Sequence, residues 1–206
     1  MLRAIVLAAG ASSRMGRPKS ALPVPGAADP GDTFLRHLGN TLLRAGLPQI
    51  AIVTGAAPLH AREAWPVSDP RVRFVQNDAW EEGQLSSLRH GILSVSAPEL
   101  EAVLVALVDV PLVSRPTVQR LIEVWRRRRP PIVRPSHGGV HGHPVIFDCV
   151  TFDDLLTADL PEGAKTIVHA HHDQVVNVEV DDRGAFLDFD TPSDLRAGTG
   201  RTRGPG

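Results

Sequence analysis

Residues 4–19 read Ala-Ile-Val-Leu-Ala-Ala-Gly-Ala-Ser-Ser-Arg-Met-Gly-Arg-Pro-Lys. The stretch begins as an apolar run suited to a buried β-strand and ends in small residues and glycines, with Arg14 and Lys19 in the same loop. Small residues let backbone N–H groups approach an anion closely, and two cations neutralise more than one phosphate. We therefore expect a nucleoside-triphosphate site at the end of the first strand.

The spacing of this loop differs from that of two common phosphate-binding loops. A Walker-type loop has four residues between its glycines and continues directly into Lys-Ser or Lys-Thr. Here five residues separate Gly10 from Gly16, and Arg17 and Pro18 precede Lys19. The G-x-G-x-x-G fingerprint of dinucleotide-binding folds is also missing from this loop. Both alternatives fail on spacing.

Beyond the loop, short apolar runs rich in β-branched residues alternate with amphipathic stretches, which predicts an α/β fold with a mainly parallel sheet. The run 102–108 is apolar throughout and fits a central strand covered on both faces. Expected strands are 3–8, 49–54, 71–76, 102–108, 132–134, 145–147 and 175–180. Expected helices are 33–45, 58–65, 85–95, 116–128, 152–158, 164–169 and 192–196. We expect a single domain over 1–196 and a disordered tail over 197–206, which has almost nothing to bury.

Composition and net charge limit the kinds of molecule that the protein is expected to bind. Of 206 residues, 42% are hydrophobic and 22% charged, and the formal net charge is −1. With a net charge near zero, we expect no overall electrostatic attraction to nucleic acid or to an anionic membrane. The four arginines at 126–129 fit the solvated end of a helix. No apolar segment approaches 18 residues, so we expect no membrane span. The chain lacks a signal-peptide pattern, which favours the cytoplasm.

The single cysteine excludes an internal disulfide framework and a multi-thiolate metal site. Cys149 lies among apolar residues, so we expect a buried and unreactive thiol.

A carboxylate, Asp109, follows the most apolar strand directly. The carboxyl ends of parallel strands are where α/β sheets bind ligands. An unpaired carboxylate is costly to bury, and Mg²⁺ with phosphate oxygens would satisfy it, because magnesium is held by only one or two carboxylates. The alternative is a helix cap, but Pro116 starts the next helix later and Ser114 is the better cap. Asp109 is thus a candidate metal ligand.

Taken together, Leu7 to Lys19 resembles the L-A-A-G-x-x-x-R-M-G-x-x-K signature of the nucleotidyltransferases, with every fixed position filled. The resemblance implies a three-layer αβα sandwich with a Rossmann-like nucleotide-binding half. It also implies that the loop wraps a triphosphate, with Arg14 near the departing pyrophosphate and Lys19 near the reacting centre. The residues that would touch the triphosphate are Leu7, Ala8, Ala9, Gly10, Arg14 and Lys19.

Residues 77–91 look like a segment of the molybdenum-cofactor cytidylyltransferases, N-x-x-W-x-x-G-x-x-x-S-L-x-x-G. There the segment lies near the base and ribose, which implies that Gly83, Ser86 and Ser87 bind the nucleotide and favours CTP over GTP. From their spacing alone, without reference to the family, Leu85 and Leu88 are expected to form an apolar stripe on the helix that faces the core. The two interpretations are compatible, because a helix can pack on one face and bind at its start.

Three later segments resemble the rest of the family pattern. Residues 134–147 resemble its acceptor-side stretch, and 163–165 its Gly-rich turn, which makes His143 and Lys165 candidate acceptor-binding residues. The histidines at 137, 141 and 143 leave zinc, acceptor binding and plain solvation open. Residues 188–195 resemble D-x-D-T-P-x-D-L, which implies that Asp190 is a second Mg²⁺ ligand opposite Asp109. Asp194 with Thr191 forms a capping-box variant.

The implied reaction is magnesium-dependent nucleotidyl transfer from CTP to the terminal phosphate of the molybdopterin cofactor, with release of pyrophosphate. Arg14, Lys19 and Asp109 would be the catalytic residues, and a molybdoenzyme would be a partner. Two alternatives stay open: a guanylyl- or other nucleotidyltransferase acting on a sugar phosphate or another small phosphate, and a nucleotide-binding module that delivers the cofactor without turnover.

Overall fold

A computed structural model describes residues 1–206 except 28, 30, 67, 198–199 and 203–206. Its strands are β1 (Leu2–Ala8), β2 (Ile50–Thr54), β3 (Val72–Gln76), β4 (Ala102–Leu107), β5 (Ile132–His137), β6 (Val140–His141), β7 (Val145–Asp148), β8 (Val175–Glu179), β9 (Leu187–Asp188) and β10 (Arg201–Thr202). Its α-helices are α1 (Phe34–Arg44), α2 (Pro58–Ala64), α3 (Gln84–Val95), α4 (Arg115–Arg128), α5 (Phe152–Thr157), α6 (Ala164–Ala170) and α7 (Pro192–Ala197). The predicted helices and longer strands are confirmed within two residues at most ends, although β5 runs three residues further than expected.

Eight strands form one sheet in the order β3-β2-β1-β4-β7-β5-β6, with β8 added beside β5. The four strands β3, β2, β1 and β4 are parallel, and β8 is parallel to β5. The strand β7 enters antiparallel between β4 and β5, and the short β6 is antiparallel to β5. The predicted α/β class is confirmed, and the parallel half is the part that carries the glycine loop.

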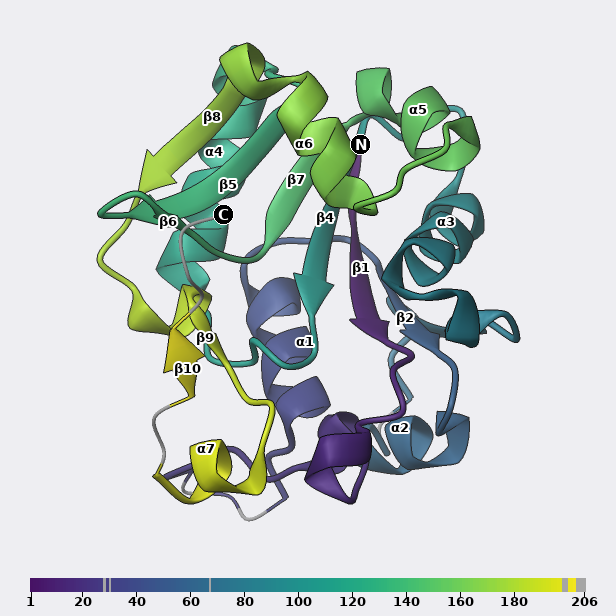
Figure 1. The fold of residues 1–206 in the computed structure, drawn as a ribbon, viewed down its shortest axis with the longest axis vertical. Coiled ribbons are helices and arrows are strands. Elements are labelled where there is room, and N and C mark those ends of the chain that lie inside the picture. The colour runs from purple at the N-terminus through teal and green to yellow at the C-terminus, as the bar shows by residue number, and fades with distance from the viewer. Residues whose placement is uncertain (28, 30, 67, 198–199, 203–206) are drawn as a thin grey trace.

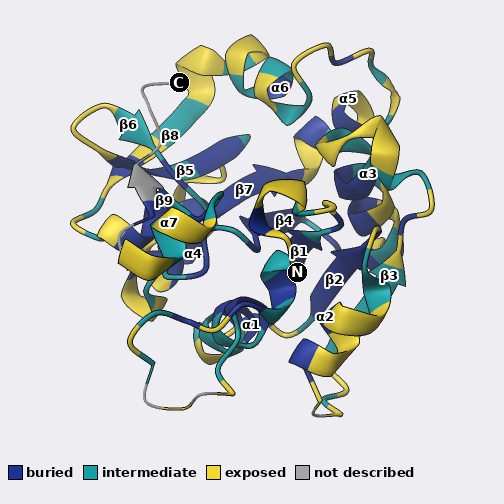
Figure 2. Ribbon diagram, turned by 60° about the horizontal axis from the view of Figure 1, so that its bottom comes forward, coloured by how far each residue is buried: buried dark blue, intermediate teal, exposed yellow. Residues whose placement is uncertain are grey.

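Two apolar layers cover the two faces of the sheet, as the alternation along β1 requires. Ala4 and Val6 pack into a core with α1 and α4, whereas Ile5 and Leu7 pack into a core with α3, α5 and α6. Every residue of β4 is buried, which confirms the expected central strand. Figure 2 shows the central strands in dark blue and most of the yellow, exposed residues on the helices and loops around them. The fold therefore has three layers.

Helix ends follow the sequence signals. The Thr33 side chain accepts a hydrogen bond from the Arg36 amide. Ser114 does the same for Thr117, so the predicted Ser114 cap is present. Asp194 Oδ2 accepts from the amides of Asp190 and Thr191, as a capping residue does. Among the described residues, no helix has the length and apolarity that a bilayer crossing requires.

Two expectations differ from the structure. Cys149 is exposed rather than buried, because the strand β7 ends at Asp148 and the chain turns outward in a 3-10 turn over Cys149–Thr151. Partial desolvation of the thiol and the nearby Asp148 carboxylate raise the pKa of Cys149, so the thiol is nonetheless a poor nucleophile. In the expected disordered tail, Arg201–Thr202 pair with Leu187–Asp188, and residues 198–199 and 203–206 lie outside the described part.

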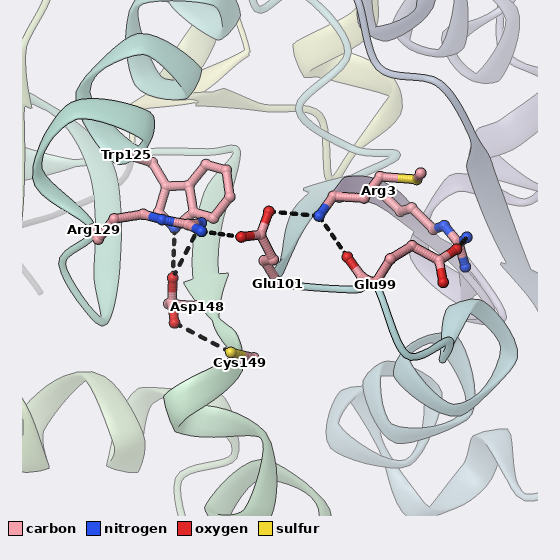
Figure 3. Close-up of polar contacts among 8 residues, drawn as sticks. Arg3, Glu99, Glu101, Trp125, Arg129, Asp148 and Cys149 are labelled. Carbon is pink, nitrogen blue, oxygen red and sulfur yellow. Dashed lines mark hydrogen bonds and ion pairs between the residues drawn. The ribbon is translucent and has the colours of Figure 1, made fainter.

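A polar cluster joins the start of β4 to the end of α4 (Figure 3). The indole N–H of Trp125 donates to Asp148 Oδ2 at 2.9 Å, and both side chains are buried. The guanidinium of Arg129 stacks over the Trp125 ring at 4.4 Å and pairs with Glu101. The cluster ties α4 to β4 and β7 at the end of the sheet opposite the glycine loop.

We expect Trp125→Phe to lower the free energy of unfolding by about 2 kcal/mol more than Trp65→Phe does, because the first change leaves a buried carboxylate oxygen without its donor. Trp65 is a matched control, since it is equally buried and its indole N–H has no acceptor among the described residues. Urea unfolding of both variants measures the difference. Equal losses would show that the Trp125–Asp148 hydrogen bond contributes nothing.

Candidate active site

The loop after β1 forms a cavity at the carboxyl ends of β1 and β4, the edge at which parallel sheets bind ligands. Figure 1 shows the purple segment after β1 and the yellow segment before α7 at the same, lower end of the sheet. The cavity has a volume of about 350 Å³. The predicted residues that line it are Leu7, Ala8, Ala9, Gly10, Arg14, Lys19, Gly83, Ser87, Asp109 and Asp190.

An ammonium group bridges two carboxylates inside this cavity. Lys19 Nζ lies 2.6 Å from Asp190 Oδ1 and 3.1 Å from Asp109 Oδ2. The Lys19 side chain is only 14% exposed, so these contacts are sheltered from water. One positive charge therefore faces two negative charges, and Arg14, at 3.7 Å from Asp190 Oδ2, adds a second cation at the rim.

The electrostatics of the cluster keep Asp190 ionised. The hydrogen bond from Lys19 is the main cause that lowers the pKa of Asp190, and the charges of Lys19 and Arg14 act in the same direction against partial burial. An Asp whose pKa is lower in the folded protein stabilises the fold above its unfolded pKa, and that stabilisation is lost as the pH falls through the folded value. Asp190 is thus ionised at neutral pH.

Local contacts hold the loop in place for this arrangement. The backbone N–H of Lys19 donates to Ser12 Oγ at 3.1 Å, which closes the loop on itself. Met15 is buried and anchors the middle of the loop in the core, while Gly16 has φ of 68°, a conformation that favours glycine. The chain can then turn back and present the Lys19 side chain to the end of the sheet.

The second carboxylate comes from the far end of the chain. Phe189 is fully buried against Phe34, with ring centroids 5.2 Å apart, and its N–H donates to the carbonyl oxygen of Asp109 at 3.0 Å. Asp194 caps the backbone of Asp190 on the other side. Asp190 is therefore positioned by contacts before and after it.

At the opposite wall, a buried amide organises the start of α3. Asn77 Nδ2 donates to Ser86 Oγ at 2.9 Å and to Ser87 Oγ at 3.1 Å, and its Oδ1 accepts from the Ala79 amide. Ser87 lines the cavity, whereas the Ser86 hydroxyl is engaged with Asn77 and with the Ala79 carbonyl. The structure thus places Ser86 behind the wall that Ser87 forms.

The predicted acceptor residues lie in a neighbouring cavity of about 610 Å³. His143 and Lys165 both line it, from the segment before β7 and from α6. Leu7, Gln84 and Leu107 line both cavities, so the two are adjacent. Two adjacent cavities, each lined by polar and apolar side chains, therefore meet across the end of β1 and β4.

The carboxylate pair suits a divalent cation that shares its coordination with phosphates. Magnesium takes oxygen ligands, usually one or two carboxylates plus phosphates and water. Asp109 and Asp190 supply carboxylates from facing segments, and the described residues contain no group of three His, Cys, Asp or Glu side chains placed to hold a metal. The donor set fits Mg²⁺ or Mn²⁺ bound together with a nucleotide.

Two polar residues in or beside these cavities carry no role in the sequence analysis. Asn77 stands in the quoted family-like segment, and its burial after an apolar strand was the available signal. Arg134 lines the second cavity, but as one charged residue near the end of a strand it gave no local sign of a role.

Comparison with known proteins identifies the family of this chain. Residues 4–175 match the family described as the MobA-like NTP transferase domain, and the chain belongs to this family of nucleotidyltransferases. The site residues Arg14, Lys19 and Asp109 fall within the matched region.

Individual relatives differ in what they are named for. The chain is 26% identical to the molybdenum cofactor cytidylyltransferase of Escherichia coli K12 over 93% of its length and 92% of the relative. It is 27% identical to a probable molybdenum cofactor guanylyltransferase of Mycolicibacterium paratuberculosis, over 95% and 94%. Over 70% of this chain and 69% of the relative, it is 34% identical to nicotine blue oxidoreductase of Paenarthrobacter nicotinovorans.

Among solved structures, the manganese complex of Rv0371c from Mycobacterium tuberculosis H37Rv superposes with a TM-score of 0.72 at 27% identity, covering 96% of each chain. The fold and the family are thereby established.

Proposed function

We propose that this protein transfers the cytidylyl group of CTP to the terminal phosphate of the molybdopterin cofactor and releases pyrophosphate. The observation that carries the proposal is the Asp109–Lys19–Asp190 cluster inside the cavity of the glycine loop. The cytidylyltransferase of Escherichia coli, similar over nearly the whole chain, supports the choice of substrates.

The residues of the chain would act by positioning and by neutralising charge. Backbone N–H groups of the loop hold the triphosphate, and Arg14 at the rim stabilises the departing pyrophosphate. Lys19 leaves the carboxylates and contacts the phosphate at the reacting centre. A phosphate acceptor is already an anion near neutral pH, so no general base is required. Magnesium, held by Asp109 and Asp190 together with the phosphates, would supply further neutralisation of the developing negative charge.

Choice of base depends on the wall at the start of α3. The Asn77 network fixes Ser87 in the cavity, and a hydroxyl can pair with the edge of a pyrimidine. We test the choice by measuring which triphosphate, with Mg²⁺, raises the melting temperature most. CTP is expected, and GTP in its place would favour the guanylyltransferase alternative that the Mycolicibacterium relative represents.

The relative named as an oxidoreductase is a reason to test the chemistry as well as the binding. Hydride transfer does not require a lysine between two carboxylates beside a phosphate loop, whereas nucleotidyl transfer uses all three groups. We therefore retain the transferase proposal. The proposal also includes delivery of the product to a molybdoenzyme. It places the protein in the cytoplasm, where triphosphates are made.

In the nucleotide-free protein, Lys19 occupies the position between the carboxylates that a cation would take. We expect Lys19→Met to raise the affinity of the nucleotide-free protein for Mn²⁺ by roughly tenfold or more, since two facing carboxylates without a counter-ion repel each other. Turnover should fall at the same time. The electron paramagnetic resonance signal of free Mn²⁺ measures the affinity, and Lys165→Met is the control. Unchanged Mn²⁺ affinity in Lys19→Met would contradict this assignment.

A further inference from the structure

The second cavity contains a cation whose partners are neutral. Arg134 lies on β5, two residues after Ile132, so both side chains face the same side of the sheet. Ile132 packs in one core with Val145 and Phe147, and these two line the second cavity together with Arg134. The Arg134 guanidinium therefore lies on the side of this cavity that the sheet forms.

Its hydrogen bonds hold Arg134 in one orientation. Nε donates to Asn177 Oδ1 at 2.8 Å, across the register pair that joins β5 to β8. Nη2 lies 3.2 Å from His141 Nε2. A guanidinium has only donors, so this histidine nitrogen accepts and the ring is neutral. Burial and the charge of Arg134 both lower the pKa of His141, which agrees with a neutral ring.

Among the described residues, no carboxylate forms an ion pair with Arg134. Within the described part of the chain, no Asp or Glu oxygen lies within 4.0 Å of the Arg134 nitrogens, and no hydrogen bond reaches Nη1. Glu82 and Glu162 line the same cavity, but they come from the segments beside α3 and α6 and form no ion pair with Arg134. Partial burial lowers the pKa of the guanidinium, which agrees with a cation that is partly shielded from water. Such a cation gains most from an anionic ligand.

Apolar side chains form part of the rest of the cavity, which also includes Glu82, Glu162 and Lys165. Leu85 and Leu88 come from α3, Val145 and Phe147 from β7, and Val168 from α6. Arg134 lines only this cavity, whereas Lys19, Asp109 and Asp190 line only the first one. An anion on Arg134 would thus be a different group from the triphosphate bound beside Lys19.

We propose that Arg134 determines specificity for the acceptor by pairing with an anionic group on a compound that also contacts the apolar side chains of this cavity. The planar fork of a guanidinium pairs with a carboxylate or phosphate through two parallel hydrogen bonds. Treating this compound as the acceptor rests on the proposed function, whereas its binding to Arg134 does not.

The experiment uses small probes of this chemistry. Calorimetric titration of the wild-type protein with 2-naphthoate and with neutral 2-naphthamide should show the anion binding roughly tenfold more tightly or better. Arg134→Met should abolish that preference while naphthamide binding and the melting temperature stay close to wild type. Arg73→Met, an exposed arginine on β3, is the control and should keep the preference. Replacing 2-naphthoate by 2-naphthyl phosphate tells the two anions apart, and the tighter one identifies the charged group.

A preference that survives in Arg134→Met, or no binding of either anion at millimolar concentration, would overturn the proposal. Anion binding that depends on Arg134 in a protein that releases no pyrophosphate from any triphosphate would leave this site standing and reject the proposed transferase function. The two failures are therefore distinguishable.

Discussion

Replacing Asp109 by asparagine should lower turnover by roughly 100- to 1000-fold, the loss typical of removing one preorganised charge that stabilises a transition state. The change keeps the size of the side chain and removes its charge. Lys19 then loses one of its two carboxylates, and a divalent cation would lose a ligand. Binding of the triphosphate should change much less, because in the proposed site backbone N–H groups and Arg14 would provide most of its contacts.

The measurement is pyrophosphate release at saturating Mg²⁺, with nucleotide affinity determined separately by titration. Asp173→Asn serves as a control, because Asp173 is 85% exposed and pairs only with His172 among the described residues. Near-normal pyrophosphate release by Asp109→Asn would rule out the assigned role. A loss confined to nucleotide affinity would instead make Asp109 a binding residue.

The largest loss of stability is expected from Phe189→Ala. The ring is fully buried and packs on Phe34, so its removal leaves a cavity between α1 and the segment that carries Asp190. Such a change costs about 3–5 kcal/mol in the free energy of unfolding. For a chain of this size the melting temperature should fall by about 6–20 °C. Because Phe189 precedes Asp190 directly, turnover of the folded variant should fall as well.

Thermal unfolding followed by circular dichroism measures the loss. Phe152→Ala is the matched control, since Phe152 is only partly buried on the other face of the sheet and should cost less. A Phe189→Ala variant as stable as Phe152→Ala would show that the 187–190 segment is not held by its aromatic contact. A large stability loss with normal turnover would show that Asp190 finds its place independently of the ring.

Much of the fold could be predicted from local patterns. The run 102–107 is apolar without alternation, and β4 is buried on both faces as a result. The capping residue Ser114 indicated the start of α4. The two-residue strands β6 and β9 were missed, because so short a segment has no period to detect. Cys149 was misjudged because apolar neighbours do not reveal that a strand has ended.

In the candidate site, the charged and glycine residues of the loop around Lys19 follow one another in the sequence. They could therefore be predicted as site residues from the sequence. Asp190 lies 171 positions from Lys19, and only the resemblance to a family pattern brought the two together beforehand. Arg134 shows the remaining difficulty. Its significance depends on what is absent around it in space, a carboxylate partner among the described residues, and no sequence pattern encodes that absence.

The most direct test of the central claim follows the fate of the α-phosphate. Purified protein is incubated with Mg²⁺, molybdopterin cofactor and CTP labelled at the α-phosphorus, and the products are separated from unreacted nucleotide. We predict that the label appears in a compound joined to the acceptor, with one pyrophosphate released for each label transferred, and that Asp109→Asn prevents both. Binding of CTP with neither transfer of label nor release of pyrophosphate would contradict the account and leave a nucleotide-binding module in its place.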